Sequence, residues 1–119
     1  MTTKYQQDGN VIEYTAGSAV SSGDVIAIND MVGVALADIA ASATGSVRIT
    51  GVFATIAKVA GTAWNQGDAV DWDASASAFG KGITTAAGDV TTAGIAFEAA
   101  ASGDTTAVVM LTPGAGTGI

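Results

Sequence analysis

The residues best suited to chemistry lie in one short stretch, Gly61 to Asp73, which reads GTAWNQGDAVDWD. It contains both tryptophans of the chain, Trp64 and Trp72, and three of its aspartates. Exposed rings beside carboxylates could form a carbohydrate- or cell-surface-binding platform, which is one interpretation. Tryptophans more commonly supply apolar area to a core or an interface. We therefore expect Trp64 and Trp72 to be mostly buried.

The aspartates of this stretch raise the question of a cation site. If the strand is regular, Asp71 and Asp73 project from one face, whereas Asp68 precedes them in a turn that Gly67 makes possible. The spacing lacks the glycine and the glutamate that an EF-hand calcium loop requires. We interpret the carboxylates as solvated, with Asp68 capping its turn, and keep a weak cation site at Asp71 and Asp73 as the alternative. The structural motif predicted here comprises Trp64, Gly67, Asp68, Trp72 and Asp73.

Catalytic groups are scarce in the rest of the chain. Histidine and cysteine are absent, which removes the commonest general base, the thiolate nucleophile and the commonest transition-metal ligands. The dipeptide Gly80-Lys81 lacks the leading glycine of a phosphate-binding loop. No serine lies in a Gly-x-Ser-x-Gly context. We expect a protein that is not an enzyme and that needs no cofactor or metal.

The charge balance limits the possible partners. The 119 residues carry a net charge of −7, and the four cations, at positions 4, 48, 58 and 81, are scattered. Nucleic acid is therefore an improbable partner, because phosphate binding needs clustered lysine or arginine. Arg48 and Lys81 are interpreted as ordinary surface cations. The chain has no apolar run long enough to span a membrane and no apolar signal-peptide core, so we expect a soluble protein that is synthesised in the cytoplasm.

The composition favours β-structure with a thin core. Valine, isoleucine and threonine together supply 36 residues, whereas there are 25 alanines, 16 glycines and only two leucines. β-branched side chains pack well on a pleated sheet, while alanine contributes little apolar area. We expect one domain over residues 1–119 that gains further buried surface by forming an oligomer.

The pattern along the chain predicts strands separated by small polar loops. The predicted strands are Val11–Thr15, Val25–Ile28, Met31–Ala37, Ser46–Lys58, Val70–Trp72, Val90–Glu98 and Thr105–Thr112. A change of phase at Gly51 indicates a bulge or bend within the longest of them. Residues 74–88 are predicted to form a mobile excursion with a weak hairpin. Residues 1–9 are predicted to be a polar N-terminal arm, and residues 114–119 a flexible C-terminal tail.

Two parts of the sequence resemble each other. Residues 23–28 (GDVIAI) are similar to residues 67–72 (GDAVDW), and residues 33–37 (GVALA) to residues 94–98 (GIAFE). Each pair is followed by a small-residue loop and an apolar strand. The pattern predicts an all-β fold, a small antiparallel β-barrel or sandwich with two similar halves and a flexible N-terminal arm.

Several of these segments together resemble the DUF2190 family of tailed bacteriophages. The matching segments are Ser22–Val25, Gly33–Ala35 leading to Gly51–Phe53, Ala63–Asp73, and Ala93–Ala96 followed by Ala101–Asp104. The resemblance extends from about Tyr5 to Leu111, and its most specific part is Trp64 to Asp73.

The resemblance implies a capsid decoration, or cement, protein. Such proteins are small, β-rich and often trimeric, and they bind the outside of an assembled head. We therefore expect a structural virion protein on the outer capsid surface that acts without catalysis, with the major capsid protein and its own copies, in a homotrimer, as partners. The predicted docking arm carries Lys4, Tyr5, Gln6 and Gln7. A carbohydrate- or cell-surface-binding module that uses Trp64 and Trp72 is the alternative.

Overall fold

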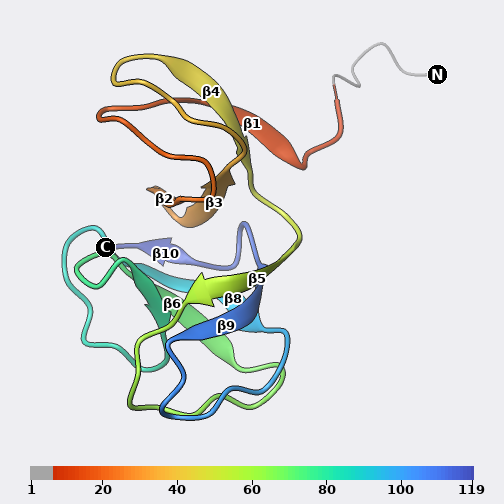
Figure 1. Ribbon diagram of the computed structural model, residues 1–119, viewed down its shortest axis with the longest axis vertical. Helices are drawn as coiled ribbons and strands as arrows, with labels where there is room; N and C mark the ends of the chain where they lie inside the picture. Colours follow the sequence, from red (N-terminus) through yellow and green to blue (C-terminus); the bar gives the residue numbers. More distant parts are fainter. Residues whose placement is uncertain (1–6) are drawn as a thin grey trace.

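The computed structural model describes residues 7–119, and its regular structure consists of ten β-strands (Figure 1). The strands are β1 (Val11–Thr15), β2 (Val25–Ile28), β3 (Met31–Ala35), β4 (Thr44–Arg48), β5 (Val52–Ala57), β6 (Ala69–Asp73), β7 (Ala78–Gly80), β8 (Val90–Ala96), β9 (Thr106–Leu111) and β10 (Thr117–Gly118). The all-β prediction is confirmed. Over the described residues, no helix has the length and apolar character needed to cross a membrane.

The strands form two antiparallel sheets. The first has the order β1-β4-β3-β2, and the second has the order β5-β9-β8-β6-β7 with β10 paired to β8. Figure 1 shows the first sheet above the second, with the β2–β3 hairpin as the part of the first sheet nearest the second. A single bridge between Lys58 and Phe79 links the outer strands of the second sheet at one end, without closing a barrel. The fold is therefore sandwich-like, and the barrel that was predicted beside it does not form.

The two sheets contain the same four-stranded unit. Strands β1, β4, β3 and β2 of the first half correspond to β5, β9, β8 and β6 of the second. The register agrees as well: Ile26 lies opposite Gly33 in the first half, and Val70 lies opposite Gly94 in the second. The prediction of two similar halves is confirmed by this pairing. The second half has β7 and β10 in addition.

Four strands begin at or near a turn that ends in Gly-Asp. In each turn, the aspartate carboxylate accepts a hydrogen bond from the backbone N–H three residues earlier, at 2.8–3.0 Å. The backbone N–H of the aspartate donates to the carbonyl of the same earlier residue, at 3.0–3.1 Å. The four aspartates are Asp24, Asp68, Asp89 and Asp104. These residues fix where β2, β6, β8 and β9 start.

The buried side chains form two clusters, one on each face of the β2–β3 hairpin. The larger cluster contains Val32 and Val34 together with the tryptophans and the apolar residues of the second half. The smaller cluster lies within the first half and contains Ile26 and Ala35. Because side chains alternate between the faces of a strand, the hairpin supplies side chains to both clusters. The burial of β3 on both faces agrees with its mostly apolar sequence.

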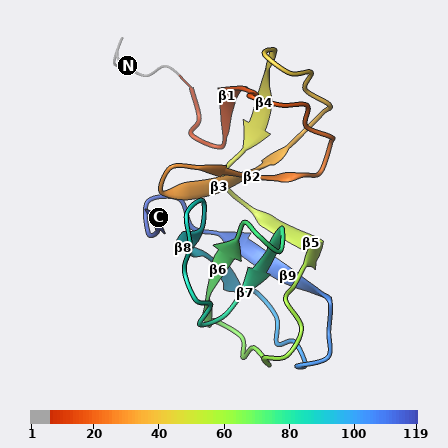
Figure 2. The ribbon, with the colours of Figure 1, turned by 90° about the vertical axis from the view of Figure 1, so that its left-hand side faces the viewer.

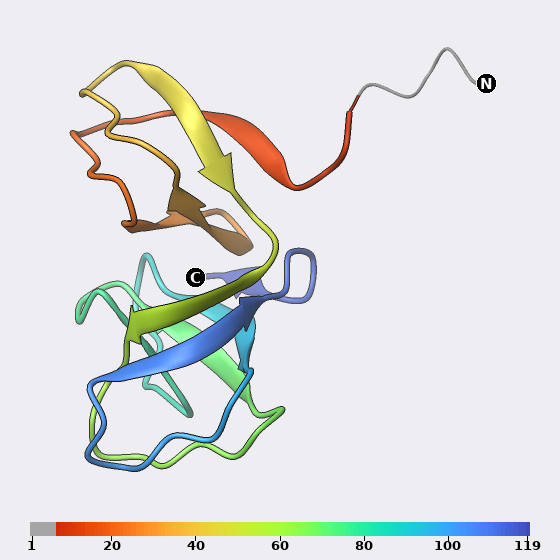
Figure 3. The same ribbon diagram turned by 45° about the vertical axis from the view of Figure 1, so that its right-hand side comes forward.

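One predicted strand divides into two. Residues 46–58 were expected to be a single strand with a bend at Gly51, but β4 ends at Arg48 and β5 begins at Val52. Between these residues the chain passes from the first sheet to the second (Figure 3). The change of phase in the sequence therefore marks the connection between the halves. The bulge lies further on, between Phe53 and Ile56.

Residues 74–88 are anchored rather than a free excursion. Strand β7 pairs with β6, and the side chain of Phe79 is fully buried. The buried carboxylate of Asp89 accepts hydrogen bonds from the backbone N–H of Ala74 at 2.9 Å and of Ala86 at 2.8 Å. Both ends of the segment are thus held at one residue.

Residues 114–119, predicted as a flexible tail, instead carry β10. The backbone N–H of Gly118 donates to the Asp30 carboxylate at 2.7 Å, and that of Ile119 to the Asp89 carbonyl at 2.9 Å. A Cβ atom at Gly118 would overlap the carbonyl oxygen of Asn29. The glycines that suggested a linker are needed because two backbones approach closely.

Candidate functional site

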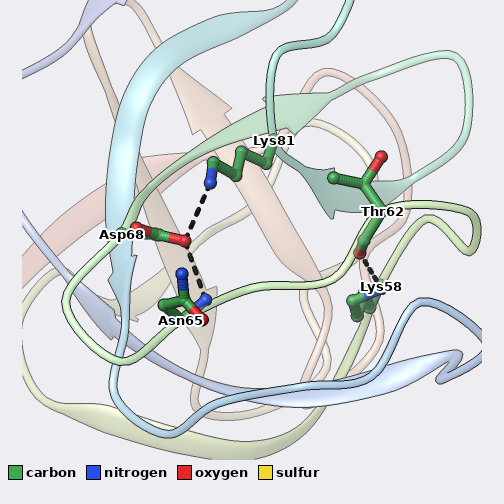
Figure 4. A network of polar contacts seen from close by, with 5 residues as sticks. All are labelled: Lys58, Thr62, Asn65, Asp68 and Lys81. Carbon is green, nitrogen blue, oxygen red and sulfur yellow. Dashed lines mark hydrogen bonds and ion pairs between the residues drawn. The ribbon is translucent and has the colours of Figure 1, made fainter.

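The central stretch places its polar residues at the turn before β6. The backbone N–H of Asn65 donates to Asp68 Oδ2 at 2.8 Å, and Gly67 adopts a φ of 90°. The Lys81 ammonium donates to the same carboxylate oxygen at 2.9 Å (Figure 4). The hydrogen bond from Lys81, followed by that from Asn65, lowers the pKa of Asp68 below its usual value. Lys81 is therefore not a lone surface cation, because it ties the β7–β8 segment to this turn.

Trp64 is buried beneath a lysine. Its exposed fraction is 1%, and the Lys58 ammonium lies 5.1 Å from the centroid of its ring. Lys58 is itself buried and donates to the carbonyl oxygens of Thr62 at 2.8 Å, Val59 at 3.2 Å and Asp104 at 3.5 Å. Figure 4 shows the contact between Lys58 and Thr62. The Trp64 ring and the Lys58 ammonium thus connect the loop after β5 with the loop before β9.

Trp72 packs within the larger cluster. Its ring meets that of Phe79 edge to face, with centroids 5.2 Å apart, and 6% of the residue is exposed. The predicted burial of both tryptophans is confirmed. Neither ring is free to stack on a sugar, so the carbohydrate-binding alternative loses the residues on which it rested.

The carboxylates of Asp71 and Asp73 accept hydrogen bonds from nearby backbone groups. Asp71 Oδ1 accepts a hydrogen bond from the Thr92 N–H at 2.7 Å. Asp73 Oδ1 accepts bonds from the Ser75 hydroxyl at 2.7 Å and from the Ser75 and Ala76 N–H groups at 3.1 and 3.3 Å. The Ser75 hydroxyl is the main reason why the pKa of Asp73 lies below its usual value. In the part of the chain that the structure describes, no three candidate ligand side chains gather as a metal site would require.

The predicted docking arm falls largely outside the described residues. Lys4, Tyr5 and Gln6 lie outside them, and Gln7 is the first residue that the structure describes. The Gln7 side chain donates to the Val11 carbonyl oxygen at 3.0 Å, beside the outer edge of β1. The described end of the arm therefore lies next to β1.

Sequence reasoning missed the roles of two cations, Lys58 and Lys81. By the pairing of the two halves, Lys58 stands where Ala16 stands in the first half: Ala16 N–H donates to Ala43 O, and Lys58 N–H donates to Thr105 O. Aligning the two repeats would have shown a lysine at a core position. Nothing in the sequence shows that Lys81 reaches Asp68, because that contact depends on the path of residues 74–88.

The fold and these contacts define a small all-β protein. The aromatic and charged side chains of its central stretch hold turns and loops together. A family model described as phage cement protein matches residues 6–111, and the chain belongs to this family. Comparisons with curated proteins and with solved structures gave no match. Membership of the family implies a capsid-associated structural protein of the virion.

Proposed function

We propose that this cement protein decorates the outer surface of an assembled bacteriophage capsid and stabilises the shell by binding alone. The observation that carries the proposal is the family match over residues 6–111. The commitment of Asp68, Asp71 and Asp73 to backbone and lysine contacts supports a role without catalysis. A ligand that binds only the assembled shell shifts the equilibrium towards that shell by mass action.

The proposed partners are the major capsid protein and two further copies of this chain. The choice of a homotrimer rests on the resemblance described above. A self-association surface is supported by large apolar side chains that the isolated chain leaves outside its core. Leu36 is 48% exposed and Phe97 is 43% exposed, and they occupy equivalent positions after β3 and β8. The net charge of −7 keeps free trimers apart in solution.

The proposed anchor is the N-terminal arm, residues 1–9. Lys4, Tyr5, Gln6 and Gln7 offer hydrogen bonds and one aromatic ring to a partner. Gln7, the first described residue of the arm, contacts the start of β1, which is a strand at the edge of its sheet. An extended segment can satisfy its backbone groups by pairing with a strand of a partner.

The test is a decoration assay with purified heads that lack this protein. Full-length protein should bind expanded heads and leave immature heads undecorated, and light scattering should give the mass of a trimer. Deleting residues 1–9 should abolish head binding while the melting temperature and the trimer mass stay nearly unchanged. A control variant replaces the same residues by a Gly/Ser segment of equal length. Full occupancy by the deletion variant would refute the arm, a monomer mass would refute the trimer, and no binding by intact protein would refute decoration.

A further inference from the structure

Strand β2 presents an open edge. Among residues 7–119, which the structure describes, it pairs only with β3, and the order of the first sheet ends there. Because Ile28 and Met31 flank a two-residue turn, the hydrogen-bonding groups of Ile28 and Ile26 face β3, whereas those of Val25 and Ala27 face away. An unpaired edge of this kind is a template for another strand.

The second half shows what occupies the equivalent edge. Strand β6 corresponds to β2, and its outer edge is covered by β7. In that pair, Asp71 lies opposite Gly80 and Trp72 lies opposite Phe79. By the repeat, Asp71 corresponds to Ala27. The same unit therefore exists here twice, once with the edge filled by a strand of its own chain and once with the edge open.

The open edge runs beside a row of cavities between the halves. Three cavities, of about 400, 460 and 400 Å³, follow one another from Gly23 to Asp30. Figure 2 shows β2 passing above the β6–β7 hairpin. This hairpin contributes part of the opposite wall of two of the cavities. The outward-facing residues Val25 and Ala27 line the cavities, and the opposite wall contributes Thr55, Trp72, Ala74, Ser77, Gly88 and Asp89.

We propose that the edge of β2 accepts an extended segment of the capsid subunit as an added antiparallel strand. The inference rests on the proposed function, because it takes the capsid as the partner. Strand β7, with the sequence Ala-Phe-Gly, is the template for the segment. By this template, the segment has one large apolar residue with a small residue on each side. Asp24 and Asp30 are exposed at the two ends of the row, so the segment carries a lysine or arginine at an end of the added strand.

Hydrogen exchange on decorated heads tests the proposal directly. Binding to expanded heads should slow exchange at the amides of Val25 and Ala27, which gain hydrogen-bond partners, while the outward amide of Ala54 on β5 keeps its rate. Unchanged exchange at Val25 and Ala27 on fully decorated heads would overturn the inference and leave the proposed function intact. Failure of the intact protein to bind heads would overturn both. Slow exchange at Val25 and Ala27 already present in the free oligomer would assign the edge to a second copy and overturn the proposal.

Two variants and a cross-link add a second readout. Ala27→Pro removes one outward donor and should weaken head binding about tenfold, whereas the matched change Ala54→Pro on the edge of β5 should leave binding within about twofold. The chain has no cysteine, so a single introduced cysteine can be labelled with a thiol-reactive photo-cross-linker. Ser77→Cys carries the label at the cavity wall, and Ser102→Cys carries it in a distant loop. Ser77→Cys should capture the capsid subunit and Ser102→Cys should not. Capture only of another copy of this chain, or of nothing on decorated heads, would refute the proposal even if Ala27→Pro failed to fold.

Discussion

The ammonium of Lys58 lies 5.1 Å from the ring centroid of Trp64, and both residues are buried. In the first half, the corresponding positions hold Ala16 and Val20, as the bridges Val20–Ile39 and Trp64–Ala100 indicate. The second half therefore has a cation and an indole where the first half has two smaller apolar side chains. One ammonium thereby satisfies carbonyl oxygens from two loops.

Replacing Lys58 should destabilise the fold through those carbonyl oxygens. Lys58→Met keeps most of the apolar stem but leaves the carbonyls of Thr62 and Val59 without their donor, which should cost about 1–3 kcal/mol. Urea unfolding measures the free energy. Lys81→Met is the comparison, because Lys81 is 41% exposed and the loss of its ion pair should change the free energy of unfolding little. Equal stabilities for Lys58→Met and the parent protein would show that solvent replaces the ammonium.

Trp72 should contribute to the core as a large apolar group. Trp72→Ala should lower the free energy of unfolding by about 3–5 kcal/mol, because it leaves a cavity beside Phe79. Val52→Ala, at a site that is 44% exposed, should change it by less than about 1 kcal/mol. Chemical denaturation followed by circular dichroism measures both. A loss below about 1 kcal/mol for Trp72→Ala would mean that the ring supports little of the fold.

Stability should fall in acid, and Asp68 and Asp73 should contribute to the fall. The pKa of each is lowered in the folded state, so the folded protein binds fewer protons than the unfolded chain. Their contribution is complete above the unfolded value, about pH 4, and is lost as the pH falls through the folded value. Melting temperatures from pH 2 to 7 should decline below about pH 4, and Asp68→Asn should reduce the decline. If the melting temperature of Asp68→Asn falls in acid as steeply as that of the parent protein, the Asp68 carboxylate does not contribute to the loss of stability.

The segment that contains β10 should lock the two halves together. Gly118→Val places atoms against the Asn29 carbonyl oxygen and should cost about 1–3 kcal/mol by forcing the backbones apart. Gly17→Ala is the control, since a Cβ at Gly17 meets nothing within 4 Å. Thermal unfolding gives the stabilities, and hydrogen exchange near Asp30 should rise only in Gly118→Val. Equal exchange near Asp30 in the two variants would show that the segment is dispensable for the lock.

The sequence was informative where local chemistry decides the structure. The predicted strand Val25–Ile28 agrees with β2 at both ends, because the turn ending at Asp24 and the turn at Asn29 bound an apolar run. The burial of Trp64 and Trp72 followed from the apolar bulk of their rings. The Gly-Asp dipeptide is a strong local signal for the start of a strand, since a strand begins at or near Asp24, Asp68, Asp89 and Asp104.

The rest could not be read from the sequence because it depends on distant contacts. The glycines of residues 114–119 predict flexibility. In the structure, Gly118 instead allows two backbones to approach, because a side chain at this position would overlap the backbone of Asn29. The same composition made residues 74–88 look mobile, although Phe79 is fully buried and Asp89 holds both ends. Of the predicted docking residues Lys4, Tyr5, Gln6 and Gln7, only Gln7 is described, so the arm stays a prediction.

The hydrogen bond between Gly118 and Asp30 joins residues that are 88 positions apart. The β2–β3 hairpin leaves the ribosome early, but its contact with Gly118 cannot form until nearly all of the described chain has been made. Contacts of such high sequence separation slow folding, because a long loop must close before they reward it. The final docking of the halves is therefore a late step of folding. The cavity that Asn29, Asp89 and Gly118 line takes its shape only in this step.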